Sequence, residues 1–174
     1  MNSQRDKNMG QCAKESEKAN SRNEGLSLLE KDTETPKPNG QKIKPSVLFL
    51  CDGEEGYSLV AQSILNHKAA SYFKGLCAFT SEVCNIASAC QSLRQYNIAC
   101  RDDHLRTIEA YQGQNVDFLI ALSPSSVQSG KSLPRYTKFI PWDITQGGET
   151  SDRQITVKYI NDQINYFLSV YLYR

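Results

Sequence analysis

Apolar residues in the second part of the chain gather into short continuous runs, separated by stretches with helical spacing. The clearest runs, Val47–Leu50 and Val116–Leu122, are typical of strands whose two faces are both covered. Two shorter runs, Leu76–Thr80 and Phe139–Trp142, predict a second strand and a last one. Pro141 has no amide hydrogen to donate, so the last strand is expected at a sheet edge, or Pro141 at its end.

Between these runs, apolar residues recur every three to four positions, which predicts helices. The predicted helices are Val60–Phe73, Ile86–Tyr96, Leu105–Tyr111 and Val157–Tyr171. Asn97 is expected to end the second helix in the left-handed conformation, and Ser151 with Gln154 forms a capping-box signature before the last. The alternation predicts an α/β fold, a three-layer sandwich with helices on both faces of a four-stranded, mainly parallel sheet.

The first part of the chain has a different texture. Residues 1–44 are rich in Lys, Glu, Ser, Asn and Gln, and they cannot bury enough apolar surface to offset the entropy of ordering them. Pro36, Pro38 and Gly40 make the end of this stretch a linker. The sequence therefore predicts a disordered polar tail and linker over 1–44 and one domain over 45–174.

Composition excludes several classes of function. A net charge of +1 with acids and bases interspersed leaves no basic face for nucleic acid. No apolar run reaches the length of a membrane span, and the polar N-terminus is unlike a secretory signal, so we expect a cytoplasmic location. In this reducing compartment the six cysteines are expected to be free thiols. Without a CxxC pair and with only two histidines, we expect no metal and no cofactor.

Candidate chemistry lies between Cys51 and Ser58, where a strand ends in a glycine-containing loop that opens a helix. Several backbone N–H groups converge in such a loop, and the helix dipole adds partial positive charge, so the geometry favours an anion. The same groups stabilise the thiolate of a cysteine at the head of the loop. A cysteine followed by five residues and then arginine and serine is how several phosphatases use this geometry.

The segment Val47–Ser63, VLFLCDGEEGYSLVAQS, resembles the opening of the low-molecular-weight protein-tyrosine phosphatases and the related thioredoxin-coupled arsenate reductases. Those proteins typically read VLFVC-T-G-N-T-C-R-S-P-M-A-E-A. Cys77–Thr80 stands where the family has Ser-Ala-Gly-Thr, and Trp142–Ile144 resembles the tract before its catalytic Asp-Pro. The resemblance covers roughly Lys44–Arg174 and implies the family's four-stranded parallel sheet flanked by helices.

By this resemblance, Cys51 is in the nucleophile's place and Ser58 in that of the hydroxyl that assists the thiolate. The arginine position, however, is Tyr57, which is uncharged and cannot grip two phosphate oxygens. A loop carboxylate about 6 Å from a phosphate charge costs roughly 3 kcal/mol at an effective dielectric near 20. Such acids also raise the pKa of Cys51. The degenerate loop comprises Asp52, Gly53, Glu54, Glu55, Gly56 and Tyr57.

Other parts of the family's machinery are altered as well. Alignment of Trp142–Ile144 puts Gln146 at the general acid, unless the loop shifts and Asp143 takes that role. The reductase relay of two further cysteines after the third strand is absent, since no cysteine follows Cys100. A cation that rescues catalysis would have to come from elsewhere, such as Arg101 or Arg106.

Three interpretations follow. The first is an inactive phosphatase-like domain, a pseudophosphatase, that acts as a regulatory or scaffolding module by binding another protein and binds oxyanions poorly. Glu54 or Glu55 would then fold inward and occupy the anion nest. The second is an active phosphatase or arsenate reductase with Cys51 as nucleophile, Ser58 as its assistant and Asp143 as acid. The third is a redox sensor, which requires another thiol within disulfide reach of Cys51.

Overall fold

The computed structural model describes residues 42–53, 55–102, 105–147 and 152–173. The chain divides into two units, Met1–Lys42 and Ile43–Arg174, and the second contains every described helix and strand. Almost all of the tail predicted over 1–44 lies outside the described residues, so the boundary at 44 stays a prediction.

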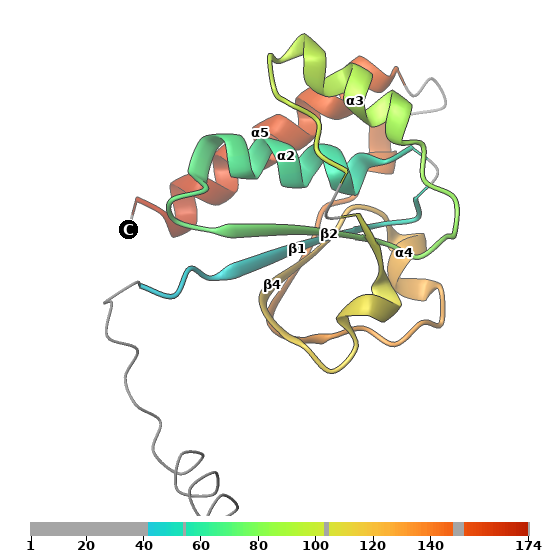
Figure 1. The fold of residues 1–174 in the computed structure, drawn as a ribbon, viewed down its shortest axis with the longest axis vertical. Coiled ribbons are helices and arrows are strands. Elements are labelled where there is room, and N and C mark those ends of the chain that lie inside the picture. Colours follow the sequence, from blue (N-terminus) through green and yellow to red (C-terminus); the bar gives the residue numbers. More distant parts are fainter. Residues whose placement is uncertain (1–41, 54, 103–104, 148–151, 174) are drawn as a thin grey trace, which may run out of the picture. The chain divides into compact units, whose positions relative to one another are not determined.

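The described part of the domain is built on a parallel sheet of five strands in the order β3-β2-β1-β4-β5 (Figure 1). The predicted α/β class is confirmed, but the strand number is five rather than four. The strands are β1 (Ser46–Cys51), β2 (Lys74–Phe79), β3 (Arg106–Thr107), β4 (Asn115–Ala121) and β5 (Arg135–Pro141).

The unexpected strand, β3, lies where the sequence predicted the start of a helix over Leu105–Tyr111. Only Ile108–Tyr111 is helical there, as the 3₁₀ helix η1. β3 pairs with the end of β2, opposite Ala78 and Phe79. Two residues leave no periodicity from which a strand is recognisable.

Helices cover the two faces of the sheet unequally (Figure 1). Along β1, Val47, Phe49 and Cys51 belong to the core beneath the long helices, whereas Leu48 and Leu50 pack on the side of η1. The first face carries α2 (Tyr57–Ala69), α3 (Ile86–Gln95) and α5 (Arg153–Tyr171), and the second carries η1 and the single-turn α4 (Pro124–Gln128). A further 3₁₀ turn, η2 (Ile144–Gly147), precedes α5. The second face is therefore only thinly covered.

Two predicted helix ends have different outcomes. Asn97 has a φ of 56°, which confirms the left-handed residue after α3. The residue that caps α5 is Asp152, whose carboxylate accepts a hydrogen bond from the Gln154 amide, so the predicted capping role of Ser151 is wrong. Ser151 itself lies outside the described residues. None of the helices in the described ranges has the length and apolar character needed to cross a bilayer.

Candidate functional site

The loop after β1 lies where the chain order of the sheet reverses. β1 is paired on one side with β2 and on the other with β4, and ligands of open α/β sheets bind at the carboxyl ends of strands at such a point. Two glycines let the chain turn into α2, Gly53 with a φ of 114° and Gly56 with a φ of 68°. A Cβ on Gly53 would stand 2.8 Å from the carbonyl oxygen of Val83, so this loop requires glycine there.

The predicted nucleophile and its assistant are brought together. The Cys51 thiol donates a hydrogen bond to Ser58 Oγ over 3.1 Å, and both side chains are buried. Burial raises the pKa of Cys51, and it outweighs the lowering by the hydrogen bond with the Ser58 side chain and by those with the backbone of Ser58 and Gly53. Cys51 is therefore a protonated thiol at neutral pH, although the donors that would stabilise a thiolate are in place.

Tyr57, in the place of the family's arginine, opens α2 directly after Gly56. Its ring lies beneath the guanidinium of Arg153, whose central carbon is 5.0 Å from the ring centroid. This is the stacked arrangement that arginine adopts on aromatic faces. The aromatic side chain thus contacts a cation but cannot itself supply one to an oxyanion.

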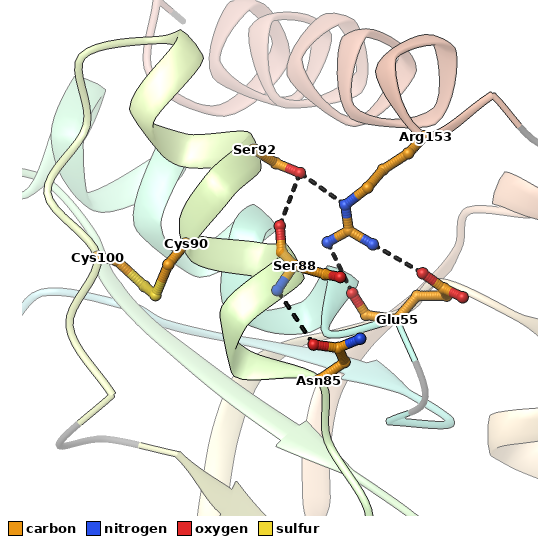
Figure 2. The surroundings of a disulfide bond; sticks show 7 residues. All are labelled: Glu55, Asn85, Ser88, Cys90, Ser92, Cys100 and Arg153. Atoms are coloured by element: carbon orange, nitrogen blue, oxygen red, sulfur yellow. Dashed lines mark hydrogen bonds and ion pairs between the residues drawn. A yellow bond between two sulfur atoms is a disulfide. The ribbon is translucent and has the colours of Figure 1, made fainter.

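Arg153, the first residue of α5, ties three elements together (Figure 2). Its Nη2 donates to the carbonyl oxygen of Glu55 over 2.8 Å, and its Nη1 forms an ion pair with Glu55 Oε2 at 2.7 Å. Its Nε donates to Ser92 Oγ of α3 over 2.7 Å. We call this set of contacts, including the stacking on Tyr57, the Arg153 clamp. It holds the guanidinium on Glu55, Ser92 and Tyr57.

The described acidic residues of the loop, Asp52 and Glu55, have different binding partners. The carboxylate of Glu55 binds Arg153 and its side chain is 60% exposed, so the hypothesis that Glu55 fills the anion nest is wrong. Glu54 lies outside the described residues. Asp52 turns toward the start of α4, where its Oδ2 accepts hydrogen bonds from Ser123 at 3.1 Å and Ser125 at 2.5 Å. The charge of Asp52 raises the pKa of Cys51, as predicted, but less than burial does.

The remaining candidates lie in separate places. Asp143 Oδ1 accepts hydrogen bonds from the amide and the hydroxyl of Thr145, and its role as general acid stays a prediction. The side chain of Gln146 lies outside the described residues. Arg106 belongs to β3, two strands away from β1, and Arg101 is exposed in the segment before it. Neither approaches the loop in any contact of the described residues.

Sequence reasoning missed Arg153 as the cation beside the loop. Arg153 and Glu55 are 98 residues apart, and no local pattern couples them. The available signals were weak ones: an arginine at the start of a helix, and an aromatic residue in place of an arginine, on which a second arginine can stack.

The prediction that all six cysteines are thiols is wrong. Cys90 and Cys100 form a disulfide bond, because the turn after α3 brings their Cα atoms to 5.1 Å (Figure 2). Burial raises the pKa of Cys77 to about 12 and that of Cys84 to about 11. Within the described ranges, no group of three or more His, Cys, Asp or Glu side chains is arranged to hold a metal ion.

The site therefore combines a buried thiol, a serine hydroxyl that accepts a hydrogen bond from it, and a loop whose adjoining guanidinium, among the described residues, is held in the Arg153 clamp. It has hydrogen-bonding groups that can stabilise a thiolate, and Tyr57 at the start of α2 has no charge with which to bind a tetrahedral anion.

Comparison with solved structures shows the same architecture. The thioredoxin-dependent arsenate reductase of Corynebacterium glutamicum is 21% identical, with a TM-score of 0.57 over 90% of this chain and 73% of that one. A low-molecular-weight protein tyrosine phosphatase from T. tengcongensis is 19% identical, with a TM-score of 0.54 over 72% and 99%. The arsenate reductase of Archaeoglobus fulgidus is 18% identical, with a TM-score of 0.53 over 71% and 98%.

At these identities the likeness concerns the fold. No family model matches the sequence, and no curated protein matches it either. The resemblance seen in the sequence and the likeness seen in three dimensions point to the same group of proteins: the chain has the fold of the low-molecular-weight protein tyrosine phosphatases and arsenate reductases.

Proposed function

We propose that this chain is a catalytically inactive phosphatase-like domain, a pseudophosphatase, that acts as a regulatory or scaffolding module by binding another protein. The observation that carries the proposal is Tyr57, which stands at the arginine position of the loop with its ring beneath Arg153. Loss of a single oxyanion donor costs an enzyme about 100- to 1,000-fold in turnover, and the loop arginine supplies two such contacts.

The state of Cys51 supports the same proposal. A nucleophilic cysteine needs a lowered pKa, and burial raises that of Cys51. Arg153 does not replace the missing arginine, because its guanidinium already binds Glu55 and Ser92. The Cys90–Cys100 disulfide disfavours the expected cytoplasmic location, because such bonds are rare in that compartment. The tail over 1–44 would act as a flexible tether.

The alternative is an active phosphatase or arsenate reductase with Cys51 as nucleophile and Asp143 as acid. One observation favours it: the Cys51 thiol and Ser58 Oγ are 3.1 Å apart, and loop amides hydrogen-bond to the sulfur. A ligand that displaces the clamp would free Arg153 for an oxyanion.

Hydrolysis of para-nitrophenyl phosphate and thermal shift with phosphate, vanadate and arsenate separate these possibilities. The native protein and Cys51→Ser should have the same turnover, and neither should be stabilised by the anions. Tyr57→Arg, alone and with Glu54 and Glu55 changed to Gln, should recover stabilisation; an anion at 100 times its Kd adds about 2.7 kcal/mol.

Turnover in the native protein that Cys51→Ser abolishes would contradict the proposal and establish the enzyme. If anions stabilise the native protein but no such turnover is seen, the protein is inactive as proposed, and the loop nevertheless binds oxyanions. Activity of native and repaired proteins should be compared at equal fractions folded, measured by circular dichroism.

A further inference from the structure

The outer edge of β5 is open in the described part of the chain. β5 is the last strand of the sheet and pairs only with β4 there. Of its seven residues, all but Ile140 are exposed. An edge strand presents a row of backbone N–H and C=O groups, to which an extended peptide can add as a further strand.

Two exposed aromatic side chains lie beside this edge. Tyr136 is opposite Val116 and Phe139 is opposite Leu119, and both of those β4 residues belong to the thinly covered face. The rings of Tyr136 and Phe139 are 5.9 Å apart between centroids, and the two side chains are 45% and 37% exposed. Neighbouring exposed aromatic rings on one face are typical of a protein interface.

A hollow of about 240 Å³ adjoins Phe139 at the end of β5. Val127 and Pro124 of α4 line one side, and Phe139, Pro141 and Trp142 line the other. Pockets for drug-sized ligands usually measure about 300–1,000 Å³, so this hollow suits one large apolar side chain better than a free small molecule.

Basic residues predominate along β5 and the segment before it. Residues 124–142 contain Lys131, Arg135 and Lys138 and no Asp or Glu. Lys131 forms an ion pair with Glu109 at 2.6 Å, and Lys138 lies over the ring of Tyr171. Arg135 and Lys138 are both exposed, and neither forms an ion pair with a carboxylate among the described residues. Complementary charge favours an acidic partner.

We propose that the edge of β5, with Tyr136, Phe139 and the adjoining hollow, binds an extended acidic segment of another protein by strand addition. We call these residues the β5 surface. One large apolar side chain of the partner enters the hollow, and its acidic side chains lie beside Arg135 and Lys138. This inference rests on the proposed binding function and names the class of partner and the place where it binds.

The register of the strands sets the form of the partner sequence. Arg135 and Phe139 are four residues apart, and strands advance about 3.3 Å per residue. Partner acids opposite Arg135 and Lys138 therefore lie about four positions and about one position, respectively, from the apolar residue that enters the hollow. Asp143 lines the far end of the hollow, which disfavours a partner carboxylate there.

Selection of random 12-residue peptides displayed on phage, with the full chain as target, tests this inference. Enriched peptides should combine one large apolar residue with acidic residues about one and about four positions away. Binding of the synthetic peptides by fluorescence anisotropy should weaken at least tenfold for Arg135→Glu/Lys138→Glu and for Phe139→Thr. Binding should also weaken as salt is raised.

Matched controls lie on other faces. Lys74→Glu/Lys158→Glu makes the same charge change on exposed residues of β2 and α5, and Tyr166→Thr removes an exposed ring from α5. These variants should bind the peptides as the native chain does. Because Arg135 and Lys138 are exposed, their double variant should fold normally, which keeps the test valid even where Phe139→Thr is destabilised.

No enrichment, enrichment of peptides without acids, or equal loss of binding in the control variants would overturn the β5 surface as the binding site. The selection does not depend on the chemistry of Cys51. Cys51-dependent turnover would therefore refute the proposed function, whereas failure of the selection would refute the β5 surface alone.

Discussion

Replacement of Arg153 by alanine should destabilise the domain and loosen the loop at Cys51. The hydrogen bond to Ser92 Oγ is partly buried and the one to the Glu55 carbonyl is exposed, and each contributes about 1 kcal/mol. The ion pair to the exposed Glu55 carboxylate adds about 0.5 kcal/mol after solvent screening, and the contact with Tyr57 a similar amount. Folding of the alanine variant no longer has to order the arginine side chain, and this offsets the loss by up to about 2 kcal/mol of conformational entropy.

The net loss is therefore about 1–2 kcal/mol for Arg153→Ala. For a domain of this size it corresponds to a fall in Tm of roughly 3–8 °C. Arg153→Lys keeps the charge but not the planar fork, so it should recover less than half of the loss. Amide hydrogen exchange should rise in the loop from Cys51 to Ser58 in both variants, because the Glu55 carbonyl is no longer held.

Thermal unfolding and hydrogen exchange monitored by mass spectrometry provide the measurements. Lys158→Ala, an exposed residue of the same helix, is the control and should leave Tm and loop exchange unchanged. The reasoning is refuted if Arg153→Ala melts within about 1 °C of the native protein with unchanged loop exchange. It is also refuted if Arg153→Lys has the same Tm and loop exchange as the native protein.

Two further predictions concern the cysteines. Iodoacetamide should modify Cys84 before Cys51 and Cys77 in the folded protein, because Cys84 is partly exposed and the other two are buried. The pKa of Cys84 is raised to about 11, so the rate at which it is alkylated should increase about tenfold per pH unit between pH 7 and 10. Peptide mapping by mass spectrometry measures the order, and fastest labelling of Cys51 would show an activated nucleophile. Changing Cys90 and Cys100 to Ser should cost up to about 2–3 kcal/mol in urea unfolding, since the bond closes a loop with a sequence separation of 10 residues. A reductant should reproduce this loss in the native chain but not in the double variant, and the idea fails if it alters neither.

Much of the fold was predictable because its central elements carry their own periodicity. β1, β2 and β4 are continuous apolar runs, and α2, α3 and α5 present apolar residues at helical spacing. β5 begins at Arg135, four residues before the predicted Phe139. The sequence did not indicate this start, because the first residues of β5 are exposed and form no apolar run, although they pair with β4. Patterns of burial cannot reveal an element that buries little.

The candidate site was predictable only along the chain. Cys51 is only seven residues from Ser58, and Tyr57 directly precedes Ser58, so their arrangement follows from a strand, a glycine turn and a helix. The Arg153 clamp and the disulfide depend on segments that meet only in three dimensions. Long-range pairs of side chains leave no trace in local composition.

The Arg153 clamp also bears on what an arginine at position 57 would meet. The Tyr57 ring that such a side chain would replace has its centroid 5.0 Å from the Arg153 guanidinium. Two such charges repel by about 3 kcal/mol at an effective dielectric of 20, before solvent screening. The two positions should therefore be coupled energetically: Tyr57→Arg should cost less stability when Arg153 is also replaced by alanine than in the native chain.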